Sequence, residues 1–397
     1  MDKIDYSDEA YYTPLVRTMS CRRLISILLA IFPLFVVASP IVSQVQGQTD
    51  EPSDLDFFGD FRLRYENTTN LEPGSLDDRN REVVRFRATV TKKVNELLSF
   101  GARLATGSSG DPNTADVTLG SFVDDLEVSL DRVYLELRHE DIFLTGGKFA
   151  NPFLKTDLVW DGDVNPQGVA ASYTFSGSGQ IIPKLTGMYS IVDENARTLI
   201  PDSWMWGGQT EFSVHPSPDL SFTLAGAFYD YKIRSLSNAD AGDTRSNNII
   251  SDSTGTATAY ISDFDLLDAI AVVEYRGLGE RYPIRFVGNY VKNLGAEVDE
   301  DQGFLLDLFI GRASKKNDMR FRYGYSQTET DAVLAAFSND NTTIATNYIQ
   351  HTLTIDYVAL KNTTFNLTWY LHRRNKLEPA DSNEFISRLR LNAVVKF

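Results

Sequence analysis

The sequence predicts an all-β fold, a transmembrane antiparallel up-and-down barrel, and three observations support this prediction. The last eleven residues alternate apolar and mostly polar side chains and end on an aromatic residue. Alternation of this kind returns in about sixteen segments along the chain. The connections between these segments are alternately short and long. Short periplasmic turns and long extracellular loops produce this pattern in a membrane barrel.

The carboxy-terminal segment illustrates the two faces of such a strand. Successive side chains of a strand point to opposite faces. One face of residues 387–397 is therefore apolar, and we expect it to contact lipid and to present the barrel-assembly machinery with a recognition signal made of Leu389, Leu391, Ala393, Val395 and Phe397. A soluble edge strand could show the same alternation, because the signal of a single barrel strand is weak. The prediction therefore depends on repetition.

The repeated segments give the predicted strand order. The candidate strands are 57–66, 81–92, 97–106, 130–139, 142–150, 168–176, 182–192, 204–215, 219–230, 267–276, 282–292, 303–312, 318–328, 347–359, 363–373 and 384–397. Connections after even-numbered strands are short, whereas long ones follow odd-numbered strands at 67–80, 107–129, 151–167, 231–266 and 329–346. A soluble sandwich has no reason to segregate loop lengths in this way. The 231–266 connection could hide another hairpin around Thr258–Phe264, so eighteen strands is the alternative.

The amino terminus predicts export. Two arginines, Arg22 and Arg23, precede an apolar run over 24–37 that is too short for a membrane helix and has the length of a signal-peptide core. We expect residues 1–48 to be a signal peptide and leader, with the true start at Met19 as an alternative, residues 49–56 to be a short periplasmic lead-in, and residues 57–397 to form the barrel. The single cysteine would leave with the signal, which excludes disulfides and thiol chemistry from the mature protein.

Composition fits a membrane protein that is not inserted as helices. Apolar residues make up 42% of the chain and the mean hydropathy is −0.23. A barrel tolerates a polar average because only every second strand residue faces lipid. The formal net charge of −16 argues against a nucleic-acid partner, since phosphate binding needs a basic surface. Aromatic residues near predicted strand ends would form interfacial girdles, and the candidates are Tyr65, Tyr173, Trp204, Trp206, Tyr231, Tyr348 and Tyr357.

The parity of the predicted strands places a basic arc inside the barrel. Barrel closure brings the last strand beside the first, so most of these arginines fall on neighbouring strands: Arg62, Arg64, Arg85, Arg87, Arg103, Arg320, Arg322, Arg388 and Arg390. A lipid-facing arginine at the membrane midplane would cost roughly 2–4 kcal/mol. We therefore expect these side chains to line a water-filled lumen. The alternative is that they pair with neighbouring carboxylates and only satisfy the interior.

The long connection 151–167 is the candidate for a constriction. It carries Asp157, Asp161 and Asp163, whose carboxylates would oppose the basic arc if the connection folds inward. A transverse field of this kind orders water and orients dipolar solutes, while the width of the pore limits their size. The Asp/Asn spacing could equally make only Asx turns. The parity of Lys148 is ambiguous, because Ile142 and Leu144 or Phe143 and Phe149 could form the outer face.

The segment 147–168 also carries a family resemblance. Its Gly-Lys-Phe-Ala-Asn-Pro-Phe stretch at 147–153 is followed by Trp160-Asp161-Gly162-Asp163 and by a strand that begins after Gly168. This arrangement resembles the bacterial "putative porin" family, as do the arginines at 81, 85 and 87. The resemblance implies a passive channel and places Lys148 in the lumen as a candidate of the constriction. It does not transfer a substrate.

Together these features predict an outer-membrane porin of a Gram-negative bacterium, a water-filled channel for passive diffusion of small hydrophilic solutes and ions. We expect no catalytic residue, metal or cofactor. The expected partners are outer-membrane lipid, lipopolysaccharide and small solutes, and fold analogy allows a homotrimer. Ion preference stays open, because the basic arc favours anions and the acidic total favours cations.

Two other classes remain as alternatives. The first is a surface receptor or adhesin that acts through the long loops. The second is a barrel hydrolase, for which the inward-facing histidine His372 would be the candidate base, although such a base needs an orienting partner.

Overall fold

The computed structural model describes residues 55–70, 78–110, 113–123, 125–177, 180–195, 201–234, 236, 246–377 and 383–397. The predicted signal peptide, the alternative start at Met19 and most of the short lead-in lie outside the described residues. The described residues from 55 to the carboxy terminus belong to one compact unit. Among the described residues, no helix combines the length and the apolar character needed to cross a membrane.

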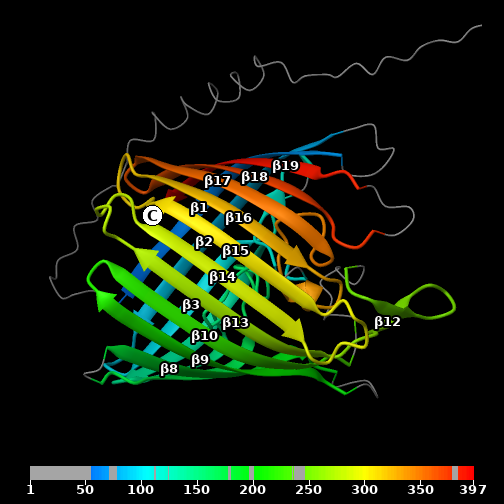
Figure 1. Cartoon of the computed structure of the whole chain (residues 1–397), viewed down its shortest axis with the longest axis horizontal. Helices are drawn as coiled ribbons and strands as arrows, with labels where there is room; N and C mark the ends of the chain where they lie inside the picture. The colour runs from blue at the N-terminus through cyan, green and yellow to red at the C-terminus, as the bar shows by residue number, and fades with distance from the viewer. Residues whose placement is uncertain are drawn as a thin grey trace, which may run out of the picture. The chain divides into compact units, whose positions relative to one another are not determined.

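Sixteen antiparallel strands close into a barrel, as the alternation predicted (Figure 1). They are β1 (Leu55–Thr69), β2 (Arg79–Lys93), β3 (Leu98–Thr106), β5 (Val128–His139), β6 (Ile142–Lys148), β7 (Gln167–Thr174), β8 (Ile181–Asp193), β9 (Ser203–Ser217), β10 (Leu220–Lys232), β13 (Phe264–Tyr275), β14 (Ile284–Asn293), β15 (Gln302–Gly311), β16 (Met319–Thr328), β17 (Tyr348–Leu360), β18 (Thr363–Arg374) and β19 (Ile386–Lys396). Each predicted strand corresponds to one of these, with ends that differ by a few residues.

The first and last strands close the barrel. β1 pairs with β19 from Asp60 opposite Lys396 to Thr69 opposite Ser387. Gly59 and Phe397 extend this pairing by exchanging two backbone hydrogen bonds of 3.0 and 3.2 Å. A Cβ on Gly59 would lie 2.6 Å from the ring of Phe397, so this position needs glycine for the terminal aromatic ring to lie over it. The ring also contacts Phe57 and Phe86 at centroid distances of 5.7 and 6.1 Å.

The elements outside the barrel are short. The two-residue strand β4 (Val117–Thr118) adds to β2 within the 107–127 connection. Strands β11 (Ile249–Ser251) and β12 (Ala257–Tyr260) pair only with each other, and this hairpin projects from the barrel (Figure 1). The alternative of eighteen barrel strands is therefore wrong, because the hairpin around residues 249–260 makes its own two-stranded sheet. A 3₁₀ turn, η1 (Ala335–Phe337), lies between β16 and β17.

The two faces of the barrel wall differ as the parity predicted. Apolar side chains such as Leu104, Leu135, Val169 and Leu224 are exposed on the outer face, where lipid would surround them. The predicted girdle residues differ in exposure, and Tyr65 and Trp204 are partly exposed. Tyr173, Trp206 and Tyr357 are exposed. Tyr231 and Tyr348 are each only 1% exposed, so their assignment to a girdle is wrong: both point into the barrel and pack against segments folded inside it.

Candidate functional site

The predicted arginines lie inside the barrel wall on neighbouring strands. β19, β1, β2 and β3 follow one another in the sheet, and β16 is separated from β19 only by β17 and β18. Five of the nine guanidinium side chains are buried: Arg64, Arg85, Arg103, Arg388 and Arg390. Charged side chains buried in this way need partners, and their partners determine what the basic arc can do.

Each of the nine arginines forms an ion pair. Asp116 binds Arg62 and Arg64, Asp60 binds Arg85 and Arg87 at 2.8 Å, Asp131 binds Arg103, Asp356 binds Arg320 at 2.8 Å, and Asp307 binds Arg322 at 2.8 Å. Part of this pairing agrees with the alternative interpretation, in which the arginines pair with neighbouring carboxylates inside the barrel. Glu66 pairs with Arg388 and Arg390, and Asp163 also pairs with Arg87. With these two included, seven carboxylates form the ion pairs of the nine arginines.

Glu66 on β1 holds the seam between the first and last strands. Its carboxylate accepts hydrogen bonds of 2.7 Å from Arg81 Nε and Arg390 Nε, and Arg388 Nε lies 3.7 Å away. The Glu66 side chain is 1% exposed. One buried carboxylate therefore compensates three guanidinium groups, and the sequence alone does not show this because the three arginines come from β2 and β19.

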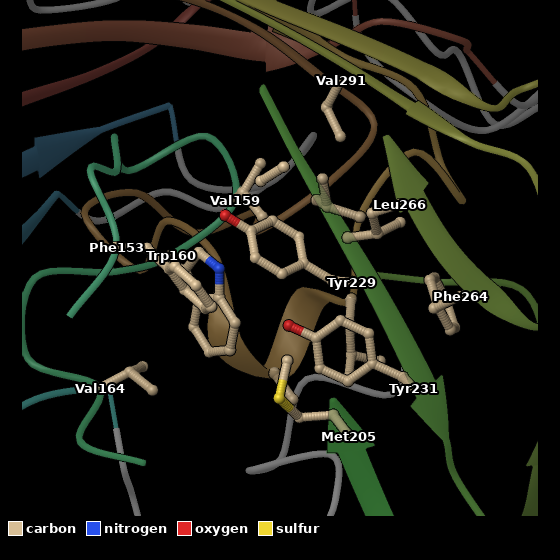
Figure 2. Close-up of a cluster of buried hydrophobic side chains, with 14 of the residues drawn as sticks. Phe153, Val159, Trp160, Val164, Met205, Tyr229, Tyr231, Phe264, Leu266 and Val291 are labelled. Atoms are coloured by element: carbon tan, nitrogen blue, oxygen red, sulfur yellow. The ribbon is translucent and has the colours of Figure 1, made fainter. Parts of the chain in front are cut away.

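The segment 149–166, between β6 and β7, folds into the barrel; we call it the inward segment. Trp160 packs against Tyr229 in an edge contact at 5.7 Å and against Tyr231 at 6.0 Å (Figure 2). Phe153 contacts Tyr229 at 5.3 Å. The aromatic partners come from β10, on the side of the barrel away from the basic arc, so the inward segment is anchored to a wall strand four positions along the sheet from β6, where it starts.

Polar contacts fix the same segment at three further points. The Gln209 amide on β9 clamps the backbone of Leu154 with two hydrogen bonds of 2.8 Å. Thr156 bonds the side chain of Asn289 on β14. At its far end, Asn165 accepts a hydrogen bond of 2.6 Å from Arg132 Nε on β5. These contacts join the inward segment to strands around most of the barrel.

The three predicted acidic residues of this segment occupy different positions. Asp163 forms a direct ion pair of 2.9 Å with Arg87 and lies 4.0 Å from Arg85. Asp157 lies with Arg322 on a cavity of about 20 Å³, which is room for about one water molecule. Asp161 is 5% exposed and forms no ion pair within the described residues. Of the three carboxylates, Asp163 is therefore the one that directly bridges the inward segment and the basic arc.

A second inward segment, residues 329–347, packs on the first. The backbone N–H of Asp161 donates to the carbonyl of Phe337 at 2.8 Å, and the Trp160 and Phe337 rings stack at 6.2 Å. Asn341 accepts hydrogen bonds of 3.0 and 2.8 Å from Arg388 and Arg390. From its length alone, this stretch was predicted only to be a long external connection. Its apolar run Ala332-Val333-Leu334-Ala335-Ala336-Phe337 is the signal that could have revealed burial.

Lys148 lies at the end of β6 on an internal cavity that Arg103 and Asp131 also line. The backbone of Gly147, just before Lys148, has a φ of +117°. A Cβ on Gly147 would lie 2.3 Å from the carbonyl oxygen of Val133, so this position needs glycine. The pairing of β6 with β5 continues through Gly147 and Lys148 without a shift in register.

The surroundings of two histidines bear on the alternative of a barrel hydrolase. His372 is fully buried, and its Nε2 lies 2.9 Å from the Thr343 hydroxyl of the second inward segment. His351 points outward and packs against Tyr325 at 5.1 Å. Within the described residues no group of three or more acidic, histidine or cysteine side chains could hold a metal ion. His372 is thus occupied in holding the second inward segment.

We expect stability to depend on the protonation of Asp161. Burial, followed by the nearby carboxylates of Asp340 and Asp157, raises the pKa of Asp161 to about 9. The folded protein then holds a proton that the unfolded chain releases near pH 4, so stability falls as pH rises between about 4 and 9, by up to about 1.4 kcal/mol per pH unit. Thermal unfolding of wild type and Asp161→Asn across this range tests the point. In Asp161→Asn, stability should fall less steeply as pH rises than in wild type. The same dependence of stability on pH in both proteins would contradict the raised pKa of Asp161.

The closed barrel, its lipid-facing apolar exterior and its charged interior define an outer-membrane β-barrel protein with segments folded into the lumen. A family model described as "Putative porin" matches residues 63–263. The chain belongs to this family of outer-membrane porins. No curated protein matches the chain.

Solved structures show the same fold at low sequence identity. A loop L8 deletion mutant of OmpT, an outer-membrane protein of Vibrio cholerae, is 11% identical, with a TM-score of 0.53 over 86% of this chain and 99% of that chain. In-vitro folded OmpT in its trimer form is 11% identical, with a TM-score of 0.50 over the same shares.

Proposed function

We propose that this porin forms a narrow water-filled channel through the outer membrane of a Gram-negative bacterium, for passive diffusion of small hydrophilic solutes and ions. The observation that carries the proposal is the contact between the inward segment and the basic arc, in which Asp163 meets Arg87 at 2.9 Å. This ion pair is the point at which the inward segment reaches the basic arc, and charged groups of both signs beside a constriction order water and orient dipolar solutes. The inward segment, Lys148 and the arginines would then set the size limit.

The charges at this constriction favour anions. Seven carboxylates form ion pairs with the nine arginines of the basic arc and with Arg81, and Asp340 adds one negative charge near Arg390, so the arginines still outnumber these carboxylates. Asp161 adds no negative charge at neutral pH, since its raised pKa keeps it protonated. A pore lined by excess positive charge concentrates anions. We therefore propose a moderate anion preference despite the acidic total charge of the chain.

We also propose which molecules contact the barrel from outside. The apolar outer face would contact lipid and lipopolysaccharide. The barrel-assembly machinery would recognise the last strand through Leu389, Leu391, Ala393, Val395 and Phe397. A homotrimer is consistent with the trimer form of OmpT, whose fold this chain shares.

Liposome swelling tests the proposed function. Liposomes that contain the refolded barrel should swell with pentoses and hexoses, more slowly as solute size increases, and should stop with oligosaccharides. Liposomes without protein provide the baseline, and circular dichroism confirms the β-sheet content of the inserted protein. Folded barrels that admit none of the sugars would overturn the proposal.

A further inference from the structure

The described residues line a second internal cavity of about 260 Å³, apart from the small cavity that Asp157 and Arg322 share. Its walls are β3, β5, the end of β6 and the start of β7, together with the inward segment and residues 108–109 and 114–115. The volume is just below the roughly 300 Å³ at which pockets for drug-sized ligands begin. A solute of about monosaccharide size therefore fits it.

The charge around this chamber is unbalanced. Asp131 is the carboxylate that serves Arg103, and it also accepts a hydrogen bond of 2.7 Å from the Asn165 amide. Asp163 is engaged by Arg87 at 2.9 Å. Lys148 is half-buried, and within the described residues its ammonium makes no direct hydrogen bond or ion pair, although the charge of Asp131 acts on it. Asp131 is thus shared by Arg103 and Lys148, and Asp163 is taken by Arg87, so the cations of the chamber outnumber the carboxylates that remain for them.

Neutral polar groups also line the chamber. The Ser108 hydroxyl accepts the N–H of Gly110 at 3.2 Å, and the Thr114 hydroxyl accepts the N–H of Asp116 at 3.1 Å. Each hydroxyl acts as the acceptor in that contact, so its own hydrogen can be donated to a ligand. Gln167 also lines the cavity with an amide that can both donate and accept. Such groups suit the hydroxyls of a polyol.

We propose that this chamber is a binding site for a small hydroxylated organic anion of the sugar-acid class. The Lys148 ammonium holds the carboxylate of the ligand, and Ser108, Thr114 and Gln167 bind its hydroxyls. The site lies beside Asp163 at the constriction, so an occupant obstructs the passage of other ions. The proposal rests on the proposed channel function only for this last effect.

Binding is tested first without reference to conduction. Isothermal titration of the folded barrel in detergent with sodium gluconate should show saturable binding, whereas neutral glucose should bind at least about tenfold more weakly, because charge-assisted hydrogen bonds are the stronger ones. Lys148→Gln should weaken gluconate binding by about tenfold or more, and Lys148→Arg should retain most of it. Lys292→Gln is the matched control, since Lys292 pairs with Asp301 at 3.1 Å away from the chamber. Equal gluconate affinity in wild type and Lys148→Gln overturns the site.

Current measurements then separate this proposal from the channel itself. In potassium chloride, gluconate should reduce the wild-type current saturably and leave that of Lys148→Gln nearly unchanged. A barrel that conducts chloride but binds no gluconate refutes the chamber and leaves the porin. A barrel that binds gluconate through Lys148 but conducts nothing refutes the porin and leaves the chamber.

Discussion

Trp160→Ala is expected to turn a narrow, steady channel into a wider and noisier one. Trp160 joins the two inward segments to the barrel wall, through Tyr229 and Tyr231 on β10 and Phe337 on the second inward segment. Its side chain is 3% exposed. Removing a buried tryptophan costs about 3–5 kcal/mol, which lowers the ratio of docked to released segment by at least about a hundredfold.

Single-channel recording measures this effect. We expect larger mean conductance and frequent transitions between current levels in Trp160→Ala. Trp206→Ala is the matched control, because that side chain is exposed on the outer face and should not affect the lumen. A Trp160→Ala channel with wild-type conductance and wild-type noise would show that the inward segment does not limit the pore.

Glu66→Gln is expected to destabilise the barrel strongly. The substitution leaves Arg81, Arg388 and Arg390 facing a neutral amide in place of the carboxylate that now accepts hydrogen bonds from two of them. Removing one partner of a buried ion pair costs about 3–5 kcal/mol because the remaining charge is uncompensated. The loss should appear at the seam between β1 and β19, where the barrel closes.

Urea unfolding of the barrel in lipid or detergent measures how much Glu66→Gln lowers the free energy of unfolding. Glu274→Gln is the control, since Glu274 pairs with the exposed Arg276 and such surface pairs contribute about 0–1 kcal/mol. If Glu66→Gln unfolds at the same urea concentration as its control, the three arginines do not depend on Glu66. The variant that still folds should also show stronger anion preference, since one negative charge has been removed from the basic arc.

Most strands of the barrel wall could be predicted from the sequence, because apolar and polar residues alternate along each strand and because short and long connections alternate between strands. Arg62, Arg64 and the later arginines keep their parity through regular strands, so counting places them inside. The parity of Lys148 was ambiguous, because apolar residues occur on both faces of its strand. Ion-pair partners such as Asp116 and Glu66 depend on which strands become neighbours, and a single sequence gives no register between strands.

The contents of the lumen were harder to predict. The inward segment carried visible acidic residues, and its inward fold was expected. The second inward segment was read by length alone as an external loop, although the run 332–337 is apolar. Tyr231 and Tyr348 were assigned to a girdle because aromatic residues at strand ends suit both an interface and a packed interior. Which of the two applies depends on whether a loop folds back to cover them.

The most direct test is single-channel conductance of the refolded mature barrel in a planar bilayer, with the reversal potential in a potassium chloride gradient. We predict stable ohmic steps of small size and a reversal potential whose sign shows that chloride passes more readily than potassium. Ohmic steps with potassium preference would contradict the role of the basic arc. A folded, inserted barrel that passes no current would contradict the channel itself.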